Sequence, residues 1–242
     1  MEFSIIIPVF EEREKIAADI QAACAFLQSN HLAGEIIVVD DGSRDDTATV
    51  AHGVACGPEV RCTVIRYEKN RGKGFAIRAG VAAASGKYLM FADSGLCIPY
   101  ENAFVGLRMI QNGDCDLAHG SRKLAASKII KPQTWLRRLT AKIFRWLAIY
   151  WMRVPASLSD TQCGFKIYRG EVARALFGAC RSDGFMFDIE IILRARRKGY
   201  RIKEFPVEWT CDRDSRLSFT RSPKQIIREL KTIKQTLQKE HA

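Results

Sequence analysis

The sequence predicts an α/β fold with a mostly parallel central sheet and helices on both of its faces. Over the first 97 residues, short apolar runs rich in β-forming residues alternate with stretches of helical spacing. Three of these runs end abruptly in acidic residues that suit turns: Glu11–Glu12, Asp40–Asp41 and Asp93. The chain has 242 residues and is 47% hydrophobic, which is enough for one large domain with a packed core. We therefore expect a Rossmann-like N-terminal part.

Four strands and three helices are expected in this N-terminal part. The strands cover Phe3–Val9, Glu35–Val39, Val60–Tyr67 and Tyr88–Ala92, and the helices cover Glu11–Gln28, a segment after Ser43 and a segment that ends at Ala84. The first helix is predicted by the apolar spacing of Ile16, Ile20, Ala23 and Leu27. Ser43 is expected to cap the second helix. The uninterrupted apolar run Tyr88–Ala92 is typical of a strand covered on both faces.

The C-terminal part is less regular, and we expect it to complete one domain. Helices are expected at Tyr100–Asn112 and near 171–177, 187–198 and 224–239, and strands at Asp116–His119 and Ile202–Trp209. Pro206 favours an edge position for the last strand, because proline lacks a backbone donor. We divide the single domain, 1–242, into residues 1–97, residues 98–222 and a basic amphipathic C-terminal helix within 223–242.

The charge distribution predicts an anionic partner. The formal net charge is +11, which favours a nucleic acid, a phosphorylated substrate or an acidic lipid surface. No acidic residue lies between Asp116 and Asp160, and Trp135 and Trp146 lie there among arginines and lysines. We expect residues 133–153 to form an interfacial helix at an anionic membrane surface, the alternative being a core-facing helix with a solvated basic face. No nucleic-acid-binding motif accompanies these charges, so we expect no nucleic acid partner.

Cysteine usage and hydropathy predict a cytoplasmic protein that attaches peripherally to membranes. The eight cysteines include no Cys-x-x-Cys pair, which favours reduced thiols over disulfides or a zinc site. A strand is expected almost at Met1, which leaves no room for a signal peptide there. The sequence has no run of 18 or more uncharged apolar residues, so we expect no membrane-spanning helix.

The acidic strand ends predict a ligand site. In an open α/β sheet, ligands bind beyond the carboxyl ends of the strands, although Asp93 alone is equally explained as a turn residue. Carboxylates gathered there suit ribose hydroxyls, base N–H groups or a hard cation. The candidate cations for phosphate groups are Lys73, Arg122, Arg213 and Arg216. This combination describes a nucleotide-sugar pocket, and the absence of a P-loop or Gly-x-Gly-x-x-Gly after the first strand disfavours kinases and dehydrogenases.

Several short motifs in a fixed order carry a family resemblance. They are Pro8-Val9-Phe10-Glu11-Glu12, Val39-Asp40-Asp41-Gly42-Ser43, Asn70-Arg71-Gly72-Lys73-Gly74, Gly120-Ser121-Arg122, Asp160-Thr161-Gln162-Cys163-Gly164-Phe165-Lys166 and Asp214-Ser215-Arg216-Leu217. Together they resemble glycosyltransferase family 2, which has the GT-A fold. The segment from Asp160 to Lys166 is most similar to the dolichyl-phosphate (polyprenyl-phosphate) glucosyltransferase branch.

The resemblance implies an inverting transfer of a hexose from a UDP- or GDP-sugar to a polyprenyl phosphate. It implies that Phe10, Glu12, Val39 and Asp41 surround the nucleotide base and ribose, with Pro8, Lys73 and Ser94 as further substrate-binding residues. Asp93 would face the donor diphosphate or its metal ion, with Arg122 and Arg216 near the phosphates. Asp160 lies in a matching motif, and the resemblance gives it no chemical step.

One departure from the family pattern concerns the metal ion. The family's Asp-x-Asp, which holds Mg²⁺ or Mn²⁺ on the donor diphosphate, here reads Asp93-Ser94-Gly95. Gly95 has no side chain to ligate a metal, and Cys97, where related mannosyltransferases have a glutamine, is a poor ligand for Mg²⁺. Asp93 and water could hold the cation, or arginines could carry the charge. The remaining alternatives are a nucleotide-sugar-binding pseudoenzyme and a family 2 transferase that acts on a soluble acceptor.

Overall fold

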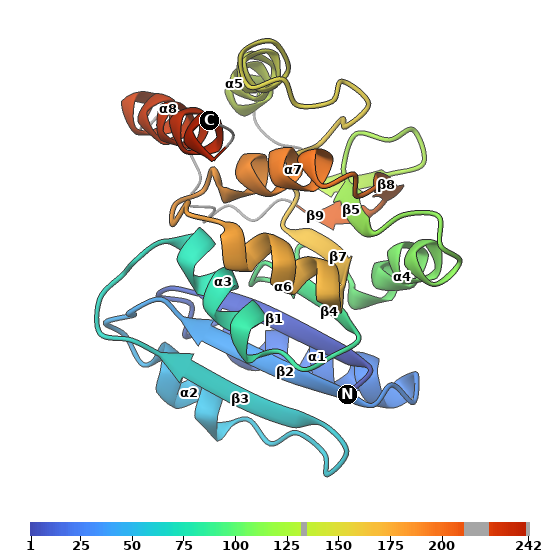
Figure 1. The fold of residues 1–242 in the computed structure, drawn as a ribbon. Helices are drawn as coiled ribbons and strands as arrows, with labels where there is room; N and C mark the ends of the chain where they lie inside the picture. Colours follow the sequence, from blue (N-terminus) through green and yellow to red (C-terminus); the bar gives the residue numbers. More distant parts are fainter. Residues whose placement is uncertain (132–134, 211–222, 241–242) are drawn as a thin grey trace.

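A computed structural model describes residues 1–131, 135–210 and 223–240, and for 135–140 and 223 it describes the helix backbone alone. The expectations for Arg213 and Arg216, and for the side chains of Trp135, Arg137 and Arg138, therefore lie outside the described part. Within it, a large twisted sheet is covered by helices on both faces (Figure 1).

The central sheet has seven strands in the order β3-β2-β1-β4-β7-β5-β8. The strands are β1 (Phe3–Val9), β2 (Gly34–Asp40), β3 (Arg61–Arg66), β4 (Tyr88–Ala92), β5 (Leu117–Ser121), β7 (Phe165–Arg169) and β8 (Ile202–Pro206). Only β7 runs antiparallel to its neighbours in this sheet, so the expectation of a mostly parallel sheet is confirmed. A second, two-stranded sheet pairs β6 (Lys128–Lys131) with β9 (Glu208–Thr210).

The helices cover the sheet in two layers. They are α1 (Ile16–Ser29), α2 (Thr47–Gly53), α3 (Lys73–Ala83), α4 (Ala103–Gln111, preceded by the 3₁₀ turn η1, Tyr100–Asn102), α6 (Gly170–Ala179) and α7 (Phe187–Arg197). One apolar core lies between the sheet and α1, α2 and α4, and a second lies between the opposite face and α3, α6 and α7. The burial of apolar side chains on both faces explains why the central strands are continuous apolar runs.

A third apolar cluster joins the C-terminal helices to this framework. Helix α5 (Trp135–Trp146) continues into the π-helical turn η2 (Leu147–Trp151), and α8 (Pro223–Lys239) lies beside them. Phe144, Ala148 and Met152 are buried at helical spacing in one cluster with residues of α7 and α8. One face of the basic segment is thus packed, as the core-facing alternative predicts.

Three details differ from the sequence-based expectations. Ser43 does not cap α2, whose N-cap position is Asp46; its hydroxyl instead accepts the Glu11 N–H at 2.7 Å. Helix α1 begins at Ile16 rather than near Glu11, because Glu11 has a positive φ of 52° and a turn follows it. The strand expected at Ile202–Trp209 is divided into β8 and β9, and β8 does lie at the edge of the sheet.

The sequence analysis missed β7, which lies between β4 and β5. Its side chains alternate between the two faces, and Phe165 and Ile167 belong to one core while Tyr168 belongs to the other. The obstacle to predicting it was Lys166, a charged residue in the centre of the strand that is nevertheless fully buried. The described helices include none long and apolar enough to cross a bilayer.

Candidate active site

The carboxyl ends of β1, β2, β4 and β5 lie at one edge of the sheet, because these strands are parallel. The amino end of the antiparallel β7 lies there too, since Phe165 pairs with Ala92 at the end of β4. The strand order changes direction between β1 and β4, which is the position where open α/β sheets bind ligands. The motif residues that follow these strands are therefore gathered along this edge.

Asp41 organises the loop that leads into α3. Its two carboxylate oxygens accept the backbone N–H groups of Arg71 and Gly72 at 2.7 and 2.8 Å. Gly42 has a φ of +74° and lies against the backbone of Lys69 and Asn70, where a Cβ would overlap. Burial raises the pKa of Asp41, and the two N–H donors oppose that shift. Asp41 is thus committed to the shape of the loop that carries Lys73.

The other residues expected around the base and ribose differ in exposure. Pro8, Phe10 and Glu12 are partly exposed, and the Glu12 N–H donates to Thr47 Oγ1 at 2.9 Å. Val39 is fully buried beneath α3, so that only its backbone could contact a nucleotide. Asp40 is also buried, and its Oδ1 accepts the Ser43 N–H at 2.9 Å, which stabilises the turn after β2.

Asp93, which follows β4, lies between Lys73 of α3 and Gly164 in the segment before β7. Its Oδ1 is 2.6 Å from Lys73 Nζ, the first residue of α3. Its backbone N–H donates to the Gly164 carbonyl at 2.9 Å, and its carboxylate lies against the Gly164 Cα so closely that a Cβ there would overlap it. The Asp93 side chain remains 40% exposed. Asp93 can therefore contact a ligand while it is held from both sides.

Asp19 is a site residue that the sequence analysis missed. This buried carboxylate on α1 accepts the N–H groups of Gly95 and Leu96 at 2.9 and 3.2 Å and the Ser94 hydroxyl at 2.5 Å. The Ser94 hydroxyl, expected to bind substrate, is thus directed to Asp19. Burial raises the pKa of Asp19, and these donors oppose it. The sequence did offer a signal for Asp19: it is an acidic residue on the apolar face of the predicted helix, three residues after Ile16.

Arg122, which follows β5, and Asp160, in the segment before β7, form an ion pair in which the aspartate is buried and the arginine is 22% exposed. Arg122 Nε and Nη2 donate to the two carboxylate oxygens at 2.6 and 2.8 Å. Burial favours the protonated carboxyl, but the guanidinium outweighs it and lowers the pKa of Asp160 to about 2. Glu204 of β8 accepts the Asp160 N–H at 2.6 Å. A carboxylate with so low a pKa is a poor general base, so this geometry suits Asp160 to the orientation of Arg122.

A second ion pair, with both side chains buried, joins Lys166 of β7 to Asp188 of α7. Lys166 Nζ also donates to the Thr161 carbonyl at 3.0 Å, which fixes the segment before β7. Burial raises the pKa of Asp188, and Lys166 opposes that shift. His119 is buried nearby, where desolvation lowers its pKa well below the usual value and keeps it neutral. Lys166, Asp188 and His119 are thus buried groups that lie behind the exposed residues of the site.

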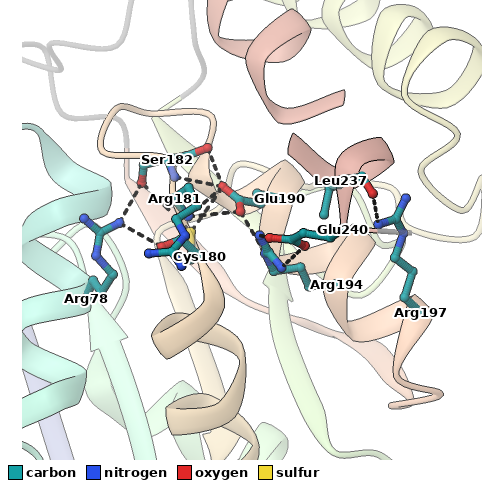
Figure 2. A network of polar contacts seen from close by, with 9 residues as sticks. All are labelled: Arg78, Cys180, Arg181, Ser182, Glu190, Arg194, Arg197, Leu237 and Glu240. Atoms are coloured by element: carbon teal, nitrogen blue, oxygen red, sulfur yellow. Dashed lines mark hydrogen bonds and ion pairs between the residues drawn. The ribbon is translucent and has the colours of Figure 1, made fainter. Parts of the chain in front are cut away.

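A network of polar contacts holds the loop between α6 and α7 (Figure 2). Glu190 accepts the N–H groups of Arg181 and Ser182 at 3.0 and 2.8 Å, and Arg194 links it to Glu240 after α8. The loop carbonyls then approach α3: Phe75 N–H donates to the Asp183 carbonyl at 3.2 Å. Gly72 and Gly74 leave no space for a Cβ beside these carbonyls. The C-terminal helix is thus connected to the loop beside Lys73.

The residues present do not fit the metal site that the family resemblance implies. No three side chains of His, Cys, Asp or Glu are grouped to hold a metal ion within the described ranges. Gly95 has a φ of 97° and no side chain to ligate a metal ion, and its backbone N–H is bound to Asp19. Asp93 is the one carboxylate left of the expected pair, and a lysine ammonium already contacts it.

Comparisons with known proteins identify the family. The family model for glycosyl transferase family 2 matches residues 4–177. The chain belongs to this family. This transferase is 32% identical over 222 residues to the dolichyl-phosphate beta-glucosyltransferase of Drosophila melanogaster. The aligned region covers 87% of this chain and 67% of the relative. The transferase is 30% identical over 228 residues to the human protein of the same name, covering 89% and 69%.

Solved structures confirm that the transferase has the GT-A fold. Glucosyl-3-phosphoglycerate synthase from Mycobacterium tuberculosis, in complex with Mn²⁺, UDP and glucosyl-3-phosphoglycerate, superposes with a TM-score of 0.69 at 20% identity. The match covers 98% of this chain and 78% of that one. Another complex of the same synthase holds Mg²⁺ and UDP. At this identity the likeness establishes the fold, and the site residues of this transferase must be argued from its own geometry.

Proposed function

We propose that this transferase moves a glucosyl group from a nucleoside diphosphate sugar to the phosphate of a polyprenyl phosphate, with inversion at the anomeric carbon. The observation that carries the proposal is the similarity to dolichyl-phosphate beta-glucosyltransferases, at 30–32% identity over 87–89% of this chain and 67–69% of the relatives. The convergence of Lys73, Asp93, Arg122 and Gly164 at the carboxyl edge of the sheet supports it, because a diphosphate needs cationic groups at this position.

The reaction needs little help from a general base. A phosphate oxygen of the acceptor forms the new bond to the anomeric carbon, and the bond from that carbon to the donor diphosphate breaks. The bonding pair leaves with the nucleoside diphosphate. A phosphate monoester has a second pKa near ~6, so the acceptor is mostly dianionic at neutral pH. This accords with the low pKa of Asp160 and the neutral state of His119.

In this reaction the protein positions the two substrates and stabilises the leaving diphosphate. Lys73 and Arg122 are two cations at this end of the sheet. Asp41 holds the loop before Lys73, Asp160 orients Arg122, and Gly164 lies against Asp93, the partner of Lys73. The base and ribose would lie beyond the end of β1, near Pro8 at the end of this strand and near Phe10 and Glu12, which follow it. A divalent cation would have to rely on Asp93 alone, so we write no step through one.

We also propose that the protein attaches peripherally to anionic membranes through the segment from α5 to η2. The face of this segment opposite its packed side carries Ile143, Trp146 and Tyr150, which are 54%, 58% and 70% exposed. The Trp146 and Tyr150 rings lie 5.6 Å apart, and Lys142 is exposed beside them. Exposed aromatic rings with neighbouring cations suit the headgroup region, where the acceptor phosphate would lie.

The test of the proposed reaction is transfer of radiolabelled sugar to organic-extractable lipid. UDP-glucose and GDP-mannose are offered as donors, with a polyprenyl phosphate in detergent or a soluble phosphorylated acceptor such as 3-phosphoglycerate. We expect label in the lipid phase only with the polyprenyl phosphate, and most from UDP-glucose. Transfer to the soluble acceptor alone would contradict the acceptor class. Binding of the donor without transfer to either acceptor would contradict the reaction.

A further inference from the structure

The loop after β4 is built in a way that excludes a second metal-binding carboxylate. Gly95 and Leu96 have positive φ values of 97° and 48°, and both N–H groups point to the buried Asp19. A side chain at the φ of Gly95 would be strained. Asp19 is 1% exposed, and its oxygens already accept three donors. The conformation of this loop therefore favours glycine at position 95, and Asp93 is the one carboxylate of the Asp93-Ser94-Gly95 segment.

A single carboxylate beside a diphosphate is unfavourable unless a cation lies between them, because the two anions repel each other. In this protein that cation is present as a side chain. Lys73 Nζ lies 2.6 Å from Asp93 Oδ1 as an ion pair, and no hydrogen bond from the described residues reaches this oxygen. The two side chains are 20% and 40% exposed, so a ligand can reach the pair.

The position of Lys73 is fixed by its surroundings. The preceding Gly72 has a φ of 107°, and its N–H is held by Asp41. On the other side, the carbonyls of Asp183 and Ser182 lie against Gly72 and Gly74, the two chain neighbours of Lys73. An ammonium group has three donors, so Lys73 can keep its contact with Asp93 and still donate to a phosphate oxygen. By contrast, two of the three guanidinium nitrogens of Arg122 donate hydrogen bonds to Asp160.

We propose that Lys73, oriented by Asp93, supplies the positive charge at the donor diphosphate, so that donor binding in this protein does not require a divalent cation. This inference rests on the proposed function and concerns its donor site. It assigns Asp93 the task of orienting an ammonium group rather than a metal ion. It also explains why the loop after β4 tolerates a glycine at position 95.

The test measures nucleotide binding, which is independent of the acceptor. UDP and GDP are titrated calorimetrically into the protein in EDTA and again in excess Mg²⁺. We expect the Kd of the bound nucleotide to agree within about twofold between the two conditions. Mn²⁺ added with the nucleotide should show no protein-bound signal in electron paramagnetic resonance. If EDTA weakens binding about tenfold and Mg²⁺ restores it, the inference is overturned. If neither nucleotide binds in either condition, the proposed function falls with it.

Three variants add an independent readout in EDTA. Lys73→Met should weaken nucleotide binding by about tenfold, whereas Lys73→Arg should recover most of it. Lys69→Met, which removes an exposed lysine from the same loop, serves as the matched control and should bind as wild type does. Asp93→Asn should bind the nucleotide as tightly as wild type or more tightly, because a repelling charge is removed. Loss of nucleotide binding in Asp93→Asn, with binding by Lys73→Met unaffected, would overturn the inference. If a variant fails to fold, the comparison of EDTA and Mg²⁺ on the wild-type protein still decides between the two outcomes.

Discussion

The Cα of Gly164 lies against the carboxylate of Asp93, and the Gly164 carbonyl accepts the Asp93 N–H at 2.9 Å. Ala92 of β4 pairs with Phe165 of β7, and Asp93 and Gly164 are the next residue on each of these two antiparallel strands. Any side chain at position 164 would occupy the space of the carboxylate. The glycine of the segment Asp160–Lys166 is thus a steric requirement of the aspartate that follows β4.

Gly164→Ala should reduce transfer about a hundredfold, because the new methyl group displaces the Asp93 carboxylate from Lys73. The measurement is the initial rate of sugar transfer, with thermal unfolding as the check on the fold. Gly178→Ala is the matched control, since a Cβ at this position in α6 meets nothing within 4 Å. It should retain activity and gain up to about 1 kcal/mol of stability. Equal activity of the two variants would contradict the steric argument.

Asp93→Asn should reduce transfer at least about a hundredfold while the melting temperature changes little, because its partly exposed side chain contributes orientation of Lys73 rather than core packing. Steady-state kinetics should place the loss in kcat. A variant with activity within a few-fold of wild type would mean that Asp93 is only a turn residue.

Asp41→Ala should weaken nucleotide binding about tenfold, and more than Asp40→Ala does. Asp41 fixes the N–H groups of Arg71 and Gly72 next to Lys73, whereas Asp40 fixes the turn at Ser43. Asp40→Ala should instead mainly lower the free energy of unfolding, since Asp40 is fully buried. Calorimetry with UDP and GDP and chemical unfolding separate the two effects, and equal losses of binding would refute the distinction.

Asp160 should make stability depend on pH in the acid range. Its pKa is about 2 in the folded protein and 3.8 without the fold, so its contribution is complete above about pH 4 and is lost as the pH falls toward 2. Asp160→Asn should therefore cost about 2–3 kcal/mol at neutral pH. That difference from wild type should narrow below about pH 4. Urea unfolding at several pH values measures it, with the exposed Glu101→Gln as control. A difference that stays constant down to about pH 3 would contradict the ion-pair origin.

Wild-type protein should co-sediment with anionic liposomes at low salt, and high salt or neutral lipid should release it, because surface attraction acts within about 8 Å at physiological ionic strength. Two variants should weaken this binding: Arg137→Glu/Arg138→Glu by charge, and Trp146→Ser/Tyr150→Ser by loss of exposed apolar surface. Arg61→Glu/Arg108→Glu changes the same charge on β3 and α4 and should bind as wild type does. Failure of wild type to bind anionic liposomes at low salt would leave the segment as an ordinary packed helix.

The sequence alone determined those features that depend on local patterns. The apolar runs of β1, β2 and β4, and the acidic turns that follow them, are encoded within a few residues each. The motif order, including Asp160–Lys166, was sufficient to predict the family and the GT-A fold, which the comparisons confirmed. Local patterns also predicted α7 and α8 within one residue at each end.

Only the tertiary structure decided how those motifs meet. Strand β7 was hidden by the buried Lys166, and its pairing with β4 brings Gly164 to Asp93 across 71 positions of sequence. Asp19 becomes part of the site because α1 packs beneath the loop after β4, and Asp41 becomes a loop anchor because β2 lies beside Arg71 and Gly72. Periodicity and turn residues report the conformation of neighbouring residues. The partners of a buried carboxylate depend on strand order and helix packing, which no local pattern specifies.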